Sequence, residues 1–257
     1  MFNREILEAS EAFNFGMYDL AERLYGEIYR SYQDIGLLDD CIYYKAEANY
    51  ALGRYNQAEV DFKLLLQQYP SSQYVPAAYK KIMYINYHFG KYDPVFQYLD
   101  RMQAIVASSD PDLEEARFLG VIAGLKSGRF DRTIGLGFEI PAGSEYYRET
   151  RFTMAEAYAG AGNFDESMKI FTDLFQEPGI DPQFRNLLLL KMGYLNYELG
   201  NYAAAISHFD LIQGDYPDYD RVLIGYAWAY YKRELLKGDN ETKDFTLARK
   251  NLEVLLD

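Results

Sequence analysis

Residues 46–70 read AEANYALGRYNQAEVDFKLLLQQYP, and they contain the pattern on which the fold prediction rests. At the centre, Leu52-Gly53-Arg54-Tyr55 places an aromatic residue two positions after a glycine, and this arrangement recurs along the chain. The glycines are Gly16, Gly53, Gly90, Gly128, Gly162 and Gly200, with successive spacings of 37, 37, 38, 34 and 38 residues. A period in the mid-thirties is typical of solenoids built from helix pairs.

Residue type also repeats at fixed distances from the glycine, and positions five, nine and twelve residues after it fall on one face of a helix. The fifth residue after it is small or β-branched: Ala21, Ala58, Val95, Thr133, Ser167 and Ala205. The ninth is mostly large: Tyr25, Phe62, Leu99, Gly137, Phe171 and Phe209. The seventh before it is mostly small: Ala9, Ala46, Met83, Val121, Ala155 and Gly193. We therefore expect a second helix to press on a first helix, with the glycine ending the first in the left-handed conformation.

The order of small residue, glycine turn, aromatic residue, alanine, aromatic residue and proline resembles the tetratricopeptide repeat. The resemblance covers six repeats, residues 2–217, although most are longer than the standard of about 34 residues. Pro70 and Pro217 are expected to stop second helices. The resemblance implies an all-α, right-handed superhelical solenoid of about seven antiparallel helix pairs.

We expect one solenoid over residues 1–257, with repeats near 2–35, 39–72, 76–109, 114–142, 148–180, 186–218 and 219–257. The seventh is irregular: Tyr226, Trp228 and Tyr231 mark its first helix, a polar loop spans 237–241, and Phe245, Ala248, Leu252 and Leu255 mark its second helix. Helical pattern at Met1 and an apolar run at residues 252–256 suggest a piece of a longer protein. No stretch approaches a membrane span.

The fourth repeat is expected to be the soft point of the solenoid, with a bend near residues 128–145. It holds Gly120, Gly124, Gly128, Gly135, Gly137 and Gly143, and each glycine inside a helix costs about 1 kcal/mol relative to alanine. Pro141 is expected to end its second helix early. The alternative is that these glycines permit unusually close helix packing.

The charge balance favours protein partners over nucleic acid. There are 26 basic and 39 acidic residues, a net charge of −13, which repels phosphate backbones. Such a surface attracts basic partners. The alternative is that the acidity only keeps an extended protein soluble.

The residues of catalytic and metal sites are sparse. Cys41 is the single cysteine, and His88 and His208 lie three repeats apart, so we expect no catalytic residues, metal or cofactor. Residues 120–127, GVIAGLKS, fail the spacing of a phosphate-binding loop. Acid pairs at 39–40 and 114–115 are expected at helix starts, where carboxylates stabilise the first turn.

The candidate binding site is the concave face, which the first helices line in a solenoid. Its outward positions lie ten, six, three and two residues before each turn glycine. The candidate residues are Tyr43, Glu47, Tyr50, Lys80, Tyr84, Tyr87, Phe118, Phe152, Glu156, Tyr194 and Tyr197, with Leu190 at an equivalent position. They predict a groove of aromatic anchors with acidic residues between them, suited to a peptide. The alternative is that the tyrosines only pack between neighbouring repeats.

These observations predict a non-enzymatic scaffold that binds a protein or peptide segment. The segments around Tyr69-Pro70 and Tyr216-Pro217 resemble repeat junctions of bacterial envelope proteins, which favours the cell envelope over the cytoplasm. The alternative is an accessory domain of a larger enzyme whose catalytic part lies outside this chain. A homo-oligomer also stays open.

Overall fold

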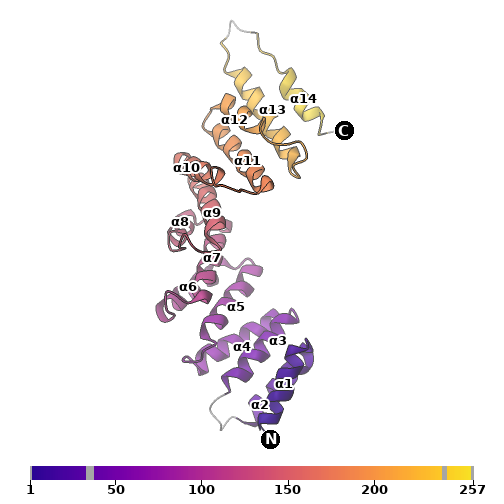
Figure 1. Ribbon diagram of the computed structural model, residues 1–257, viewed down its shortest axis with the longest axis vertical. Coiled ribbons are helices and arrows are strands. Elements are labelled where there is room, and N and C mark those ends of the chain that lie inside the picture. Colours follow the sequence, from indigo (N-terminus) through magenta and orange to yellow (C-terminus); the bar gives the residue numbers. More distant parts are fainter. Residues whose placement is uncertain (1, 33–37, 239–241, 256–257) are drawn as a thin grey trace. The chain divides into compact units, whose positions relative to one another are not determined.

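The computed structural model describes residues 2–32, 38–238 and 242–255, and Figure 1 shows its helices. These described residues form fourteen α-helices and no strand, as the sequence predicts. The helices are α1 Phe2–Asn14, α2 Tyr18–Ser31, α3 Asp39–Ala51, α4 Tyr55–Gln68, α5 Val75–His88, α6 Tyr92–Ile105, α7 Pro111–Lys126, α8 Phe130–Gly137, α9 Tyr147–Gly160, α10 Phe164–Phe175, α11 Pro182–Glu198, α12 Tyr202–Phe209, α13 Tyr219–Leu235 and α14 Thr246–Glu253.

The turn inside each of the first six pairs is made by the recurring glycine. All six have positive φ angles, from 66° at Gly90 to 79° at Gly162. At Gly53, the Arg54 N–H donates to the Asn49 carbonyl over 2.8 Å and the Gly53 N–H donates to the Tyr50 carbonyl over 3.0 Å. This pattern satisfies the last carbonyls of the first helix and requires a left-handed residue. A Cβ at Gly53 would contact nothing, so its backbone angle, and not lack of space, selects glycine.

Packing within a pair follows the predicted small-to-large contact. Phe62 of α4 and Ala46 of α3 are both fully buried in one apolar cluster, and Phe171 and Ala155 share another. In the sixth pair, a Cβ added at Gly193 would lie 2.3 Å from the Phe209 ring. The small residue of the first helix therefore makes room for the aromatic ring of the second.

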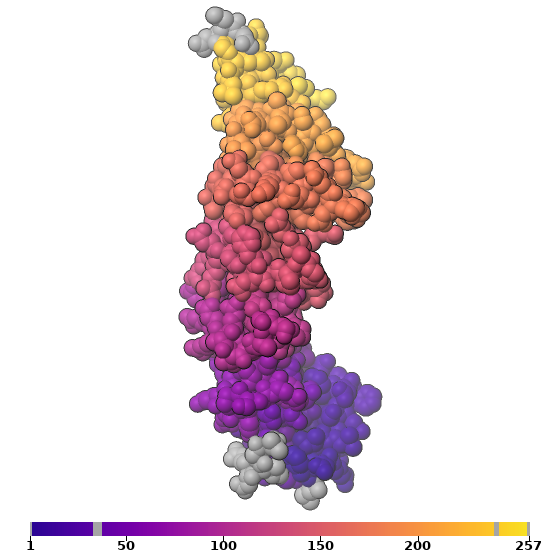
Figure 2. Space-filling model, turned by 60° about the vertical axis from the view of Figure 1, so that its left-hand side comes forward, coloured from indigo at the N-terminus to yellow at the C-terminus, as the bar shows by residue number. Residues whose placement is uncertain are grey.

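The chain divides into two compact units. Unit 1 comprises residues 1–127 and 135–146, and unit 2 comprises residues 128–134 and 147–257. Within each unit, segments that follow one another in the sequence lie side by side, as their neighbouring colours show (Figure 2), because each helix pair packs on the pairs next to it in the chain. The boundaries between the two units fall within residues 127–147, close to the repeat that was expected to be soft. The single solenoid over residues 1–257 stays a prediction.

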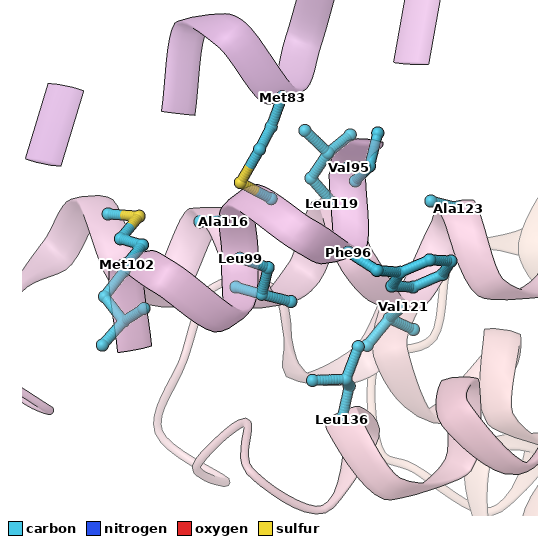
Figure 3. Packing of buried hydrophobic residues seen from close by; sticks show 11 residues of the cluster. Met83, Val95, Phe96, Leu99, Met102, Ala116, Leu119, Val121, Ala123 and Leu136 are labelled. Carbon is cyan, nitrogen blue, oxygen red and sulfur yellow. The ribbon is translucent and has the colours of Figure 1, made fainter. Parts of the chain in front are cut away.

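Close packing accounts for one of the glycines in the fourth repeat. Met83, Leu99, Leu119 and Leu136 come from α5, α6, α7 and α8 and form the core of this part of unit 1 (Figure 3). A Cβ at Gly120 would lie 2.7 Å from Leu99 and 2.9 Å from Leu136. The alternative explanation, close packing, is therefore correct at Gly120.

Two helix ends differ from the sequence prediction, and the acid pairs agree with it. α12 ends at Phe209, well before Pro217, and Tyr216 is buried beside it in the core. Pro217 therefore does not stop this helix. Phe245 directly precedes α14 and Leu255 lies beyond its end, while residues 239–241 of the predicted polar loop lie outside the described residues. Asp39, Asp40 and Glu114 lie in first turns, as expected, and Glu115 follows in the same helix.

Across the described ranges, no helix is both long enough and apolar enough to cross a bilayer.

Candidate functional site: the tyrosine-lined faces

The predicted site residues lie on the first helices of the pairs and form two sets, one in each unit. Unit 1 holds Tyr43, Glu47 and Tyr50 on α3, Lys80, Tyr84 and Tyr87 on α5, and Phe118 on α7. Unit 2 holds Phe152 and Glu156 on α9, and Tyr194 and Tyr197 on α11.

Some of these side chains join one repeat to the next. The residue ten positions before a turn glycine contacts the residue sixteen positions before the next glycine. The pairs are Tyr43–Tyr74, with ring centroids 4.2 Å apart, Phe118–Tyr146 at 4.7 Å and Phe152–Phe184 at 5.7 Å. Tyr74, Tyr146 and Phe184 are not among the predicted site residues, although their shared offset from the next turn glycine is visible in the sequence. Tyr43, Phe118 and Phe152 therefore have a packing role between repeats.

In the third repeat, an ionic cluster takes the place of the ring pair. Lys80 Nζ donates to Asp112 over 2.5 Å and to Glu115 over 2.6 Å, and the Tyr84 hydroxyl donates to Glu115 over 2.7 Å. Burial alone would raise the pKa of Glu115, but the hydrogen bonds from Lys80 and Tyr84 hold it below its usual value. Burial likewise opposes the charge of Lys80, yet its two carboxylates hold its pKa above the ordinary value. The charges of Lys80 and Glu115 therefore persist at neutral pH.

A second ionic contact occurs at equivalent positions of both units. Lys81 donates to Glu47 over 2.8 Å, and Lys191 donates to Glu156. Lys80, Lys81 and Lys191 are thus engaged with carboxylates of their own chain. In unit 1, Glu47, Asp112 and Glu115 together with Lys80 and Lys81 carry one excess formal negative charge.

The tyrosines three residues before the turn glycine are partly buried and held by a second ring. Tyr50 packs edge-on against Tyr55 at 5.3 Å, Tyr87 packs against Tyr92 at 5.9 Å, and Tyr197 against Tyr202 at 5.5 Å. Burial raises the pKa of Tyr50, Tyr87 and Tyr197. Their hydroxyls therefore stay protonated at neutral pH and can donate hydrogen bonds from rings of fixed orientation.

Two residues of the predicted face are more buried than the helical pattern suggested. Leu190 is fully buried with Phe209 and Val222, so the expectation that it faces outward is wrong. Phe118 is 9% exposed, because Tyr146 stacks on its ring.

A cavity of about 370 Å³ opens beside two of the predicted residues in unit 2. It lies between α9, α10 and α11, and its lining consists of Glu156, Ala159, Phe164, Phe171, Lys191, Tyr194, Leu195 and Glu198. Glu156 and Tyr194 belong to the predicted face. Glu198 also lies at a predicted outward position, two residues before Gly200. The other five were not predicted, because a cavity depends on which side chain is missing.

A second cavity, of about 430 Å³, lies between α13 and α14 and includes none of the predicted residues. Its lining is apolar apart from Arg249, and comprises Ala227, Trp228, Tyr231, Phe245, Ala248 and Leu252. Trp228 is 51% exposed there.

Within the ranges 2–32, 38–238 and 242–255, no three His, Cys, Asp or Glu residues are placed to hold a metal ion. Cys41 is buried, and burial raises the pKa of its thiol to about 12, so it is a poor nucleophile at neutral pH.

The tetratricopeptide repeat family matches residues 40–72 and 188–219. The chain carries tetratricopeptide repeats. The C-terminal part of a repeat-containing protein of this family from Cytophaga hutchinsonii is similar over 100% of this chain and 94% of its own, with a TM-score of 0.68 and 14% identity. A tetratricopeptide repeat protein from Parabacteroides merdae is similar over 100% and 99%, with a TM-score of 0.62 and 14% identity.

YrrB, described as a protein with an unusual peptide-binding site, is similar over 66% of this chain and 83% of its own, with a TM-score of 0.55 and 13% identity. No curated protein matches the chain. At these identities the likeness establishes the tetratricopeptide fold.

Proposed function

We propose that this protein is a non-enzymatic scaffold that binds a segment of another protein through the tyrosine-lined faces of its first helices. The observation that carries the proposal is the tyrosine at one repeat position, Tyr50, Tyr87 and Tyr197, each held against a second ring. Rigid tyrosines give a large contact area with little loss of side-chain entropy on binding. The peptide-binding site named for YrrB, which has the same fold, is consistent with this proposal.

The charges of the faces favour a basic segment. Lys80, Lys81 and Lys191 are already paired with carboxylates, whereas Glu198 is exposed. The whole chain carries a net charge of −13, which would speed the encounter with a basic partner. Binding should therefore weaken as the salt concentration rises.

The test begins with affinity capture from native lysate and identification of the bound protein by mass spectrometry. Its affinity is then measured for the variant Tyr50→Ala/Tyr87→Ala/Tyr197→Ala. Each truncated anchor costs about 1–2 kcal/mol when it contacts the partner, so we expect a loss of at least about tenfold. The circular dichroism spectrum should keep its helical form.

A matched control replaces apolar side chains that are exposed elsewhere, Val60→Ala and Phe138→Ala, with exposures of 65% and 70%. The control should bind as the unmodified protein does. Equal affinity of the triple variant and the control would refute the proposal.

We further propose that the protein acts in assembly at the bacterial cell envelope. This proposal rests on the junction phrases around Pro70 and Pro217, which resemble those of envelope proteins. Fractionation of the source cells with an antibody against the chain tests it, and recovery in the cytosolic fraction alone would contradict it.

A further inference from the structure

An aromatic ring that recurs along the chain is missing from the fifth repeat. In four repeats, a ring three positions before the turn glycine packs on a ring two positions after it. The pairs are Phe13–Tyr18 at 5.4 Å, Tyr50–Tyr55 at 5.3 Å, Tyr87–Tyr92 at 5.9 Å and Tyr197–Tyr202 at 5.5 Å. In the fifth repeat these positions hold Ala159 and Phe164. Phe164 therefore lacks the partner ring that Tyr18, Tyr55, Tyr92 and Tyr202 have, and the fourth repeat has Leu125 and Phe130 at these positions.

The second repeat shows where the missing ring would lie. There Lys81 is paired with Glu47, and its ammonium group lies 4.3 Å from the centre of the Tyr50 ring. Glu156 of the fifth repeat and Lys191 of the sixth occupy the same positions relative to their turn glycines and form the same ion pair.

The cavity of about 370 Å³ has Ala159, Phe164 and Lys191 in its lining, so it lies where Tyr50 supplies a ring in unit 1. An engineered cavity of about 150 Å³ is enough to bind benzene, so there is room for a ring.

We propose that this cavity, the aromatic socket, receives an aromatic side chain of the bound partner segment. This inference rests on the proposed function, and it names the residue type that the unit 2 face recognises. Phe164, Phe171 and Leu195 supply apolar walls for the ring. The ammonium group of Lys191 corresponds to that of Lys81, which lies over a ring in unit 1, and a cation over an aromatic face is attractive.

The rim of the socket selects the neighbour of that aromatic side chain. Glu198 lines the cavity and is exposed. It lies two residues before its turn glycine, and the third repeat has His88 at that position. The other carboxylate of the lining, Glu156, is engaged with Lys191. Glu198 is therefore the carboxylate available to an incoming cation, and the preferred segment has an arginine or lysine beside its aromatic residue.

Capped tetrapeptides serve as probes: acetyl-Gly-Tyr-Arg-Gly-amide, with Leu in place of Tyr in a second peptide and Gln in place of Arg in a third. Binding is followed by the methyl resonances of Leu195 in nuclear magnetic resonance titrations. We expect the Tyr-Arg peptide to bind at least about tenfold more tightly than the Leu-Arg peptide, a difference of about 1.4 kcal/mol. Glu198→Gln should weaken the Tyr-Arg peptide severalfold and leave the Tyr-Gln peptide unchanged.

Two reciprocal substitutions decide the assignment. Ala159→Tyr supplies the ring that four other repeats have and should abolish the shift at Leu195, whereas the control Ala159→Ser should keep it. Tyr50→Ala empties the corresponding place in unit 1 and should create a second binding event at Ile85, the counterpart of Leu195. Because the second variant gains binding, a folding defect in Ala159→Tyr would leave the inference testable.

Equal affinity for the Tyr-Arg and Leu-Arg peptides would overturn the inference, and so would an unchanged shift at Leu195 in folded Ala159→Tyr. If the triple tyrosine variant binds the natural partner more weakly but Ala159→Tyr binds it unchanged, the inference of an aromatic socket is overturned and the proposed function stands. Binding of the Tyr-Arg peptide that Ala159→Tyr abolishes would support the socket even if the triple tyrosine variant kept its partner.

Discussion

Gly193→Ala should destabilise unit 2, because the Phe209 ring lies against this glycine. A Cβ at Gly193 would lie 2.3, 2.7 and 2.8 Å from three ring carbons, far inside van der Waals contact. The ring cannot retreat freely, because it also lies close to α13: a Cβ at Gly225 would lie 2.5 Å from it. Phe209 is fully buried between α11 and α13. One methyl group must therefore displace the ring or separate the helices.

The expected magnitude follows from two opposing effects. Alanine is favoured over glycine inside a helix by about 1 kcal/mol. Overpacking of a closed core typically costs about 1–3 kcal/mol, and contacts this short belong at or above the upper end. We therefore expect a net loss of about 2 kcal/mol in the free energy of unfolding of unit 2. In the background Phe209→Leu the methyl group finds room, so the same substitution should cost at least about 1 kcal/mol less.

The assay is urea denaturation followed by the fluorescence of Trp228, the single tryptophan, which lies on α13 of the same unit. The midpoint should fall in Gly193→Ala with an unchanged slope. Equal or greater stability of Gly193→Ala would refute the packing argument. A cost that is the same with Phe209 and with Leu at position 209 would show that the ring is not the obstacle.

Three further predictions concern other parts of the chain. Gly135→Ala should stabilise α8 by about 1 kcal/mol, seen as a higher urea midpoint, because a Cβ there meets nothing. The free energy of unfolding should fall as the pH rises from about 9 towards 12. Burial raises the folded-state pKa of both Tyr25 and Cys41 to about 12, so the folded chain holds these protons more tightly than the unfolded chain. A urea midpoint that stays constant from pH 7 to about 11 would contradict this prediction. Amides of residues 130–142 should exchange hydrogen faster than those of residues 56–68, and equal protection would exclude a soft fourth repeat.

The fold was predictable because its determinants are local and repeated. The glycine of each turn, such as Gly53, needs only a left-handed backbone, and the contact of Phe62 with Ala46 joins helices that are adjacent in the chain. Six copies of the pattern support one another, so departures such as Gly137 do not hide it. Helix ends were less predictable where no glycine marks them, as α12 shows by ending well before Pro217.

The site was less predictable, because its features depend on contacts between repeats. Helical periodicity placed Tyr43 on a face, but it could not show that Tyr74 from the next repeat stacks on it. It also placed Leu190 outward, although this side chain packs into the core beside Phe209. The cavity at Ala159 follows from a missing ring and became recognisable only when the surrounding residues were seen in space.

The last prediction tests whether residues 1–257 unfold as one solenoid or as two units. Cys41 lies buried in α3 of unit 1, and Trp228 lies on α13 of unit 2, so each unit has its own reporter. Burial keeps the Cys41 thiol protonated, and labelling with a thiol reagent therefore requires opening of unit 1.

In a repeat array, stability is a sum of repeat terms and nearest-neighbour terms, so a weak repeat interrupts the transmission of a perturbation. The fourth repeat contains the short helix α8, and no neighbouring atom lies where a Cβ of Gly135 would be. The boundaries between the two units also fall in this repeat. We therefore expect Gly193→Ala to lower the Trp228 midpoint while the labelling rate of Cys41 changes by less than about twofold, because only a shift well below 1 kcal/mol should reach unit 1. If labelling of Cys41 accelerates by the same factor as unit 2 is destabilised, the two units unfold together and the fourth repeat is not soft.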